Sequence, residues 1–162
     1  MISVELALER LKAMPAVSKQ SQTTCPEENA LEKILAYAKD NALTDKPNVR
    51  LFGRNFYPFE QPEPYGYEFY LTLDKTSDHS KEVITQSVPE GLYATLRIRG
   101  ADRIPNGWHA LFRMVESAGY TPVGVCRQMY GWVTAGFEEF VNWQQSNVSQ
   151  ERIIDLWLQL RE

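Results

Sequence analysis

Apolar residues recur at helical spacing in two stretches of the chain, and each stretch has its own start and stop signals. The first follows Thr24-Cys25-Pro26-Glu27, with Thr24 as the cap and Pro26 in the first turn, and it ends at Asn41. The second begins at Pro105 and ends at Gly119. The apolar stripes are Leu31, Ile34, Leu35 and Ala38 in the first stretch and Trp108, Leu111, Phe112 and Val115 in the second. The pattern predicts two amphipathic helices.

Strand-like patterns cover most of the remaining chain. Alternating apolar and polar residues, bounded by glycine and proline, are typical of strands. The predicted strands cover residues 49–59, 67–73, 83–88, 92–99, 121–129 and 152–160. Residues 6–23 fit either a short helix followed by a strand or one longer strand. Residues 131–150 show no clear pattern, so the sequence leaves their fold open.

The two halves of the chain repeat each other. The stripe of the first helix matches Leu111, Met114, Val115 and Ala118 in the second. Residues 51–54 (L-F-G-R) match residues 122–125 (P-V-G-V), and residues 68–73 (E-F-Y-L-T-L) match residues 155–160 (D-L-W-L-Q-L). Each half then reads strand, helix, strand, strand, with repeat one at about 9–74 and repeat two at about 88–160. One such unit is too small to bury both its sheet face and its helix stripe. We therefore expect a single domain over residues 1–162, of the α+β class, in which two copies pack together.

The closing strand of each repeat separates an apolar set from a polar set. The apolar sets, expected to pack under the helices, are Phe69, Leu71 and Leu73 in one copy and Leu156, Leu158 and Leu160 in the other. The opposite face carries Glu68 and Tyr70 in the first copy and Asp155 and Trp157 in the second. Paired carboxylates beside aromatic rings predict a cleft for a cation or an aromatic amphiphile.

Tyr93 and Arg97 lie on one face of the predicted strand 92–99. Arg97 has two interpretations. It either neutralises one of the cleft acids, which weakens the cation hypothesis, or lies in solvent.

The amino-acid composition limits the kinds of partner that the protein is expected to bind. The 162 residues include 17 Lys and Arg against 21 Asp and Glu, a net charge of −4, which argues against direct nucleic-acid binding. No apolar run approaches the roughly 20 residues of a membrane helix, and no export signal precedes the first predicted element. We expect a cytoplasmic protein without membrane contact, in which Cys25 and Cys126 are reduced thiols.

The sequence predicts neither a metal nor a cofactor. Its two histidines, His79 and His109, lie far from metal-ligand spacing with cysteine. The chain contains no phosphate-binding loop, no dinucleotide-binding glycine motif and no serine-hydrolase elbow.

Four segments resemble one known family. Residues 88–100 (V-P-E-G-L-Y-A-T-L-R-I-R-G) resemble its I-P-x-G-x-Y-A strand, and residues 108–120 resemble its L…W…S-G-Y stretch. Residues 137–140 (F-E-E-F) resemble its L-E-x-Y motif, and residues 153–158 resemble its closing strand. The family comprises gyrase-inhibitor-like (GyrI-like) proteins and the effector-binding domains of AraC-type and MerR-type bacterial multidrug regulators.

The resemblance implies two pseudo-symmetric β-α-β-β repeats, with a ligand groove between antiparallel sheets and the helices on the other face. In such proteins a glutamate of the L-E-x-Y strand commonly meets cationic ligands, a role that falls on Glu138 here. The sequence does not decide whether Glu138 or Glu139 faces the groove. The predicted ligand-binding residues are Glu138, Glu68, Asp155, Tyr70, Trp157, Tyr93 and Trp108.

The resulting hypothesis is a standalone protein that binds a cationic or amphipathic aromatic small molecule. Both predicted helices belong to the repeats, so no helix-turn-helix fits. Any role in transcription regulation is expected to act through a partner such as a regulator, or by sequestering toxic compounds in the cytosol. One alternative is a GyrI-like interaction protein that engages gyrase. Another is a hydrolase of reactive small molecules that uses a groove glutamate as base or nucleophile. A hydrolase needs that carboxylate desolvated beside a donor such as Tyr70 or Tyr93, which the sequence does not demonstrate, so we favour binding over catalysis.

Overall fold

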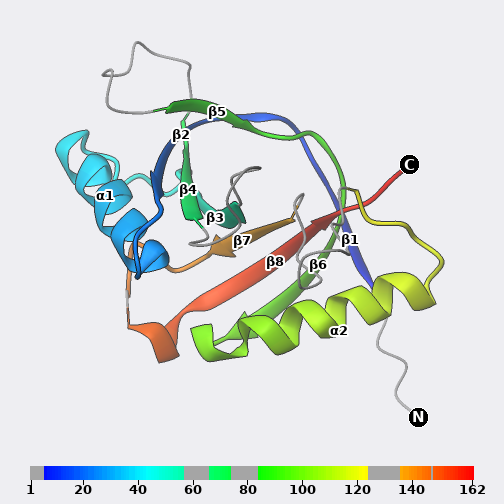
Figure 1. Cartoon of the computed structure of the whole chain (residues 1–162). Helices are drawn as coiled ribbons and strands as arrows, with labels where there is room; N and C mark the ends of the chain where they lie inside the picture. Colours follow the sequence, from blue (N-terminus) through cyan, green and yellow to red (C-terminus); the bar gives the residue numbers. More distant parts are fainter. Residues whose placement is uncertain (1–5, 57–65, 74–83, 124–135, 147) are drawn as a thin grey trace. The chain divides into compact units, whose positions relative to one another are not determined.

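The computed structural model describes residues 6–56, 66–73, 84–123, 136–146 and 148–162 (Figure 1). The chain divides into two compact units. We call Ala13–Pro89 the repeat-one unit, and we call Met1–Lys12 together with Glu90–Glu162 the repeat-two unit.

Both units are built from antiparallel strands and one long helix. In the repeat-one unit the elements are β2 (Met14–Ser21), α1 (Pro26–Asp40), β3 (Leu51–Phe56), β4 (Gly66–Thr72) and β5 (Ile84–Val88). In the repeat-two unit they are β1 (Ala7–Leu11), β6 (Gly91–Arg99), α2 (Ile104–Ser117), β7 (Gly136–Phe140), β8 (Ile153–Gln159) and the short 3-10 helices Ala101–Arg103 and Ser149–Glu151.

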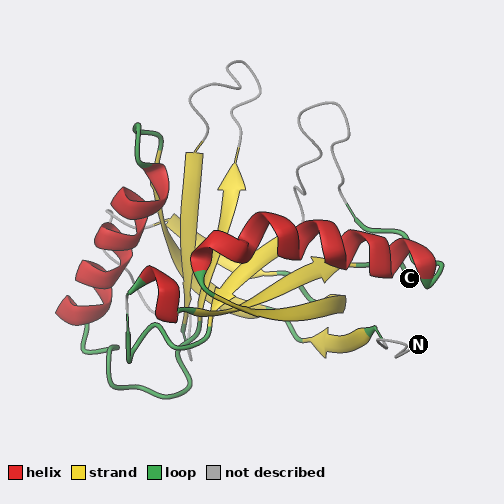
Figure 2. Ribbon diagram, turned by 90° about the horizontal axis from the view of Figure 1, so that it is seen from below, coloured by secondary structure: helices red, strands yellow, loops and turns green. Residues whose placement is uncertain are grey.

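The two units share one topology. The repeat-one strands lie in the order β3-β4-β2-β5, and the repeat-two strands lie in the order β7-β8-β6-β1. Helix α1 packs against β4 and β2, and α2 packs against β6 and β8, so each helix covers one face of its own sheet (Figure 2). The predicted α+β fold with duplicated β-α-β-β repeats is therefore confirmed, with one further edge strand added to each repeat.

The edge strand β1 corrects the prediction for residues 6–23. The structure has two strands there, where we expected either a helix and a strand or one long strand. Strand β1 pairs with β6, from Ala7 opposite Thr95 to Leu11 opposite Gly91, whereas β2 pairs with β4 and β5. Between β1 and β2 the chain passes from the repeat-two unit to the repeat-one unit. This change shows only in the pairing of the two strands with partners distant in sequence.

The N-cap of helix α1 lies one residue after the predicted cap. Cys25 is the N-cap and makes no capping hydrogen bond through its side chain, so Thr24 as the cap was wrong. Pro26 occupies the first turn and Asn41 is the C-cap, as predicted. The buried residues of the helix are Pro26, Ala30, Ile34 and Ala38, while Leu31 and Leu35 are half-buried. The apolar stripe is centred one residue before the predicted one.

Helix α2 approaches its sheet closely at Gly107. A methyl group added there would lie 2.9 Å from Cδ1 of Leu156 and 3.1 Å from Cγ2 of Ile98. Leu111 and Val115 extend this buried stripe. After the helix, Gly119 adopts φ 84°, the left-handed conformation that ends helices, as its position in the sequence predicted.

The strand after α2 differs from its prediction. Pro122 forms an isolated bridge with Leu160, residues 124–129 lie outside the described part, and β7 then pairs with β8 over residues 136–140. Phe52 lies opposite Tyr70 in one sheet, and Phe137 lies opposite Trp157 in the other. The match of residues 51–54 with 122–125 was therefore wrong in register, because β3 corresponds to β7.

Candidate functional site

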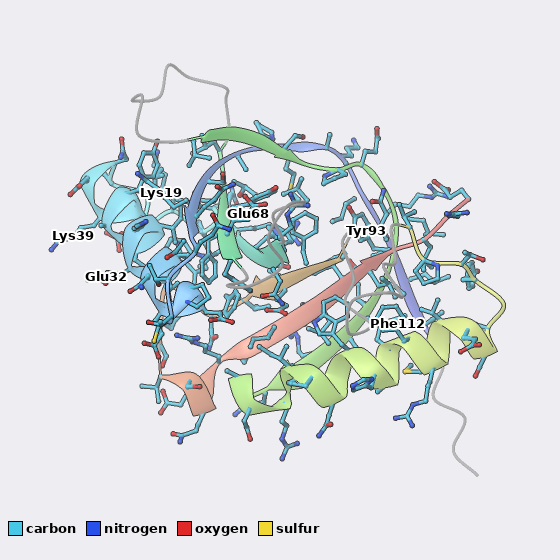
Figure 3. The ribbon with its side chains drawn as sticks, in the orientation of Figure 1. Lys19, Glu32, Lys39, Glu68, Tyr93 and Phe112 are labelled. Atoms are coloured by element: carbon cyan, nitrogen blue, oxygen red, sulfur yellow. The ribbon has the colours of Figure 1, made fainter. Side chains whose placement is uncertain are left out.

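Each sheet has a helix face and an opposite face, which we call the far face. Leu156 lies under α2, next to Gly107. Because successive strand residues point to opposite sides, Asp155 and Trp157 point to the far face of the repeat-two sheet. The matching topology assigns Glu68 to the far face of the repeat-one sheet, and Figure 3 draws Glu68 on the side of β4 away from α1.

The strand register aligns far-face residues into two matching rows in each unit. Directly paired residues of antiparallel strands share a face. The acid row is Gln20, Glu68 and Arg54 in repeat one and Arg97, Asp155 and Glu139 in repeat two. The ring row is Ser18, Tyr70 and Phe52 in repeat one and Thr95, Trp157 and Phe137 in repeat two. The duplicated pattern of an acid followed by an aromatic thus extends across three strands of each sheet.

In repeat one, the Glu68 carboxylate is buried and receives three hydrogen bonds. Arg54 Nε donates over 2.6 Å and the Tyr70 hydroxyl donates over 3.1 Å, both to Oε1, and Gln20 Nε2 donates over 2.8 Å to Oε2. Glu68 is only 2% exposed, so these donors replace the water that an ionised carboxylate would otherwise bind. The Glu68 carboxylate is therefore fixed in position by donors of its own sheet.

The guanidinium of Arg54 also covers the ring of Tyr70. Its central carbon lies 5.3 Å from the ring centroid, within range of a cation–π contact. Burial raises the pKa of the Tyr70 phenol above its usual value, so the phenol stays protonated as a donor. Neither Arg54 nor Gln20 was predicted as a site residue, since only the strand register brings them beside Glu68.

In repeat two, Arg97 neutralises Asp155. Arg97 Nε and Nη2 donate to the two carboxylate oxygens over 2.7 and 2.9 Å, and this contact raises the pKa of the Arg97 guanidinium. Of the two interpretations of Arg97, the first is correct. Glu68 and Asp155 were expected to supply counter-charge for a cation, but each carboxylate is already paired with an arginine.

The adjacent glutamates of β7 point to opposite faces. Glu139 lies on the far face, is 7% exposed, and its Oε1 accepts a hydrogen bond of 3.1 Å from Trp157 Nε1. Glu138 lies opposite Leu156 on the helix face, is 6% exposed, and its Oε1 accepts a hydrogen bond of 3.1 Å from Trp108 Nε1. The structure therefore decides which glutamate shares a face with Asp155: it is Glu139, and Glu138 and Trp108 lie on the other side.

Two aromatic residues lie beside Trp157 on the far face of repeat two. The ring of Tyr93 meets it edge to face, with centroids 5.8 Å apart, and Phe137 lies directly opposite it on β7. Tyr93 is fully buried, which raises the pKa of its phenol to about 12. The predicted set thus divides into Glu68 and Tyr70 in one unit and Asp155, Trp157 and Tyr93 in the other.

The two acid rows differ in formal charge. The repeat-one row has one carboxylate and one guanidinium, which balance. The repeat-two row has two carboxylates and one guanidinium. Position for position, Glu139 of repeat two stands where repeat one has Arg54.

Among the described residues, no group of three or more His, Cys, Asp or Glu side chains could hold a metal ion. No helix in the same part of the chain is long and apolar enough to cross a membrane. Cys25 is exposed, and Cys126 lies outside the described residues.

The fold and the paired rows define a duplicated α+β domain, and solved structures share this fold. The C-terminal domain of EcmrR matches with a TM-score of 0.67 and 16% identity over 98% of both chains. The chain spans 57% of EcmrR in its complex with DNA. SAV2435 bound to tetraphenylphosphonium matches with a TM-score of 0.53 and 9% identity over 98% of this chain and 94% of that one.

A hydrolase from Listeria innocua has a TM-score of 0.65 and 9% identity, over 97% of this chain and 92% of that one. No protein-family model and no curated protein matches the sequence. At these identities the comparisons show the fold.

Proposed function

We propose that the protein is a GyrI-like effector-binding domain that binds an aromatic cation on the far face of the repeat-two sheet. The observation that carries the proposal is the buried Glu139 carboxylate, which lies among aromatic side chains on the far face of the repeat-two sheet. Glu139 adds a second, buried carboxylate beside the Asp155–Arg97 pair. A buried cation requires both counter-charge and close polarisable groups to offset its lost hydration.

The neighbouring ring row supplies those polarisable groups. Trp157, Tyr93 and Phe137 lie on the same face as Glu139, and the indole of Trp157 donates to the Glu139 carboxylate. Ring faces attract cations, and flat rings stack with aromatic ligands. A carboxylate among three aromatic side chains therefore favours a ligand that is both positively charged and aromatic.

The solvent exposure of the repeat-two acid row increases from β7 toward β6. Glu139 is 7% exposed, the Asp155 side chain is 16% exposed and the Arg97 side chain is 63% exposed. A cation entering from the β6 end would first meet the Asp155–Arg97 pair. It would gain most at Glu139, where solvent screening is least.

One solved structure of the same fold supports this chemistry. SAV2435 holds tetraphenylphosphonium, a cation whose phosphorus carries four phenyl rings. The hydrolase alternative has less support, because Glu68, although it lies beside Tyr70, is held by three donors. Cytoplasmic location, a regulator partner and engagement of gyrase stay predictions.

The test compares two adjacent glutamates. Tetraphenylphosphonium is titrated into the full chain while tryptophan fluorescence is recorded, because Trp157 lies at the site. We expect Glu139→Gln to weaken binding at least about tenfold, which corresponds to ~1.4 kcal/mol. Glu138→Gln is the matched control, since Glu138 is equally buried and also accepts one indole hydrogen bond, but on the opposite face. Its affinity should stay within about twofold of the unmodified protein.

Tetraphenylborate provides a charge control, because it has nearly the same shape and the opposite charge. We expect tetraphenylborate to bind much more weakly than the phosphonium ion. Circular dichroism verifies that the Glu139→Gln and Glu138→Gln variants are folded. Equal binding of the two ions, or equal effects of the two substitutions, would contradict the proposal.

A further inference from the structure

The repeat-two unit has a pocket on the side of its sheet that α2 covers. Figure 1 shows the start of β1 next to α2, and the pocket lies between these two segments. Its volume is about 370 Å³, and the described residues that line it are Leu6, Arg113, Met114, Ser117 and Ala118. Binding sites for small molecules usually have volumes of about 300–1,000 Å³, so the pocket has the size of a small ligand site.

Helix α2 gives the pocket one polar and one apolar column of side chains. Residues four apart on a helix are neighbours on its surface. Arg113 and Ser117 therefore form a polar column, and Met114 and Ala118 form an apolar column beside it. Leu6 adds an aliphatic side chain from the segment before β1. No aromatic side chain is among the described lining residues, so the pocket favours a flexible aliphatic chain over a flat ring.

The side chains of the polar column have no partner among the described residues. Neither the Arg113 guanidinium nor the Ser117 hydroxyl group makes a hydrogen bond or an ion pair there, although Glu116 lies three residues beyond Arg113. By contrast, Arg54 and Arg97 are each paired with a carboxylate. Arg113 is therefore available to an anion, and a guanidinium binds a carboxylate through two parallel hydrogen bonds.

Exposure increases from the floor of the pocket to its mouth. Leu6 and Met114 are half-buried, whereas Arg113, Ser117 and Ala118 are exposed. An amphiphile can place its chain against Leu6 and Met114 and keep its charged group at Arg113, in contact with water. This orientation avoids the cost of burying an unpaired charge.

Exposed apolar residues follow the lining residues on both segments. Leu8 lies two residues after Leu6, and Tyr120 lies two residues after Ala118. They are two of the four large apolar side chains that are exposed among the described residues. Grouped exposed apolar side chains mark ligand or partner sites more often than isolated ones do.

We propose that this pocket binds an aliphatic carboxylate of medium chain length, such as octanoate. The Arg113 guanidinium pairs with the carboxylate, the Ser117 hydroxyl group donates a hydrogen bond to it, and the chain lies against Leu6, Met114 and Ala118. The pocket is separate from the cation site proposed on the far face of the repeat-two sheet, and it takes a ligand of the opposite charge.

The probes are octanoate, 1-octanol and octylammonium, which share one chain and differ in the charge of the head group. Each is titrated, below the concentration at which it forms micelles, into the full chain labelled at its methionine methyl groups, and the shifts are followed by NMR. Met114 reports on the pocket, and Met14 of the repeat-one unit is the internal control.

We expect a saturable shift of the Met114 methyl signal and little change at Met14. Octanoate should bind about three- to fivefold more tightly than octanol, near the upper end of the range for a charge pair exposed to solvent. Octylammonium should bind more weakly than either, because Arg113 repels it. Equal affinities for the three probes, tightest binding of octylammonium, or equal shifts of Met14 and Met114 would overturn the proposal.

Arg113→Gln tests the guanidinium directly. We expect it to lower the octanoate affinity to that of octanol, while the octanol affinity stays within about twofold of its value in the unmodified protein. Arg103→Gln, at an exposed position just before α2, is the matched control and should leave the octanoate affinity unchanged. Unchanged octanoate affinity in Arg113→Gln would refute the site.

Two substitutions of opposite charge at Ala118 test where the carboxylate lies. Ala118 is exposed and directly follows the last residue of α2, so a long side chain can extend into water there. Ala118→Glu should weaken octanoate binding, whereas Ala118→Lys should preserve or strengthen it. Circular dichroism verifies that both variants are folded, and equal effects of the two substitutions would contradict the proposal.

The carboxylate pocket and the cation site are tested independently. Tetraphenylphosphonium affinity should be unchanged in Arg113→Gln, and octanoate affinity should be unchanged in Glu139→Gln, because the two sites lie on opposite sides of the repeat-two sheet. A loss of octanoate binding in Glu139→Gln would assign octanoate to the far face and overturn the pocket proposal.

Discussion

At the level of single residues, the two acid–arginine pairs have the same chemistry and different surroundings. The Glu68 side chain is 2% exposed and that of Arg54 is 31% exposed, against 16% for Asp155 and 63% for Arg97. Truncating one partner of a buried pair leaves a charge that water cannot reach, whereas an exposed pair is screened. Arg54 should therefore contribute more to stability than Arg97.

We expect Arg54→Met to lower the free energy of unfolding by about 3 kcal/mol, because it removes the charged donor of the buried Glu68 carboxylate. Arg97→Met should lower it by less than about 1 kcal/mol. Urea denaturation of both variants measures the difference, with methionine preserving much of the side-chain packing in each. Equal decreases in the free energy of unfolding would show that burial does not make the Glu68–Arg54 pair more important for stability than the Asp155–Arg97 pair.

At the level of elements, α2 depends on a glycine at each end for different reasons. Gly107 lets the helix approach Leu156 and Ile98 more closely than a larger residue would allow. Gly119 instead supplies the left-handed backbone that stops the helix, with no neighbouring atom within 4 Å of an added methyl group. The effect of substituting Gly119 is therefore purely conformational.

We expect Gly119→Ala to lower the free energy of unfolding by about 1 kcal/mol, the cost of the left-handed conformation for a residue with a β-carbon. Gly119→Asn should cost less, since asparagine tolerates this conformation better. Chemical denaturation checks both values, and Ser117→Ala, at an exposed position in the same last turn, serves as the control. If Gly119→Ala left the free energy of unfolding unchanged, the result would argue against a left-handed helix end.

At the level of the whole molecule, the repeat-two unit is assembled from segments far apart in sequence. Strand β1 lies before the repeat-one unit in the chain but pairs with β6, and Arg10 of β1 also forms an exposed ion pair with Glu162. Strand β1 is thus an edge strand of the repeat-two sheet, at the position that β5 occupies in the repeat-one sheet.

Removal of residues 1–12 should loosen one sheet selectively. We expect hydrogen exchange to rise about tenfold or more at the β6 amides that bond to β1, because β6 becomes an edge strand. Exchange in β4, at the centre of the repeat-one sheet, should stay unchanged and serves as the internal control. Mass spectrometry of peptides from both strands measures this, and a similar rise in both would contradict the assignment of β1.

The sequence by itself determined the features that depend on local periodicity. Both helices, the duplication and the acid–aromatic pattern of the closing strands follow from spacings of two to four residues, which the backbone geometry of each element imposes. The left-handed end of α2 was equally local, since Gly119 needs no distant partner to adopt its conformation.

The tertiary structure decided everything that depends on which strands pair and in which register. It selected Glu139 over Glu138 for the far face, paired Arg54 with Glu68 and Arg97 with Asp155, and assigned β1 to β6. These contacts join residues separated by up to 88 positions, as Ala7 opposite Thr95 illustrates. A shift of one residue in register moves a side chain to the opposite face, and no local pattern in a single strand fixes that choice.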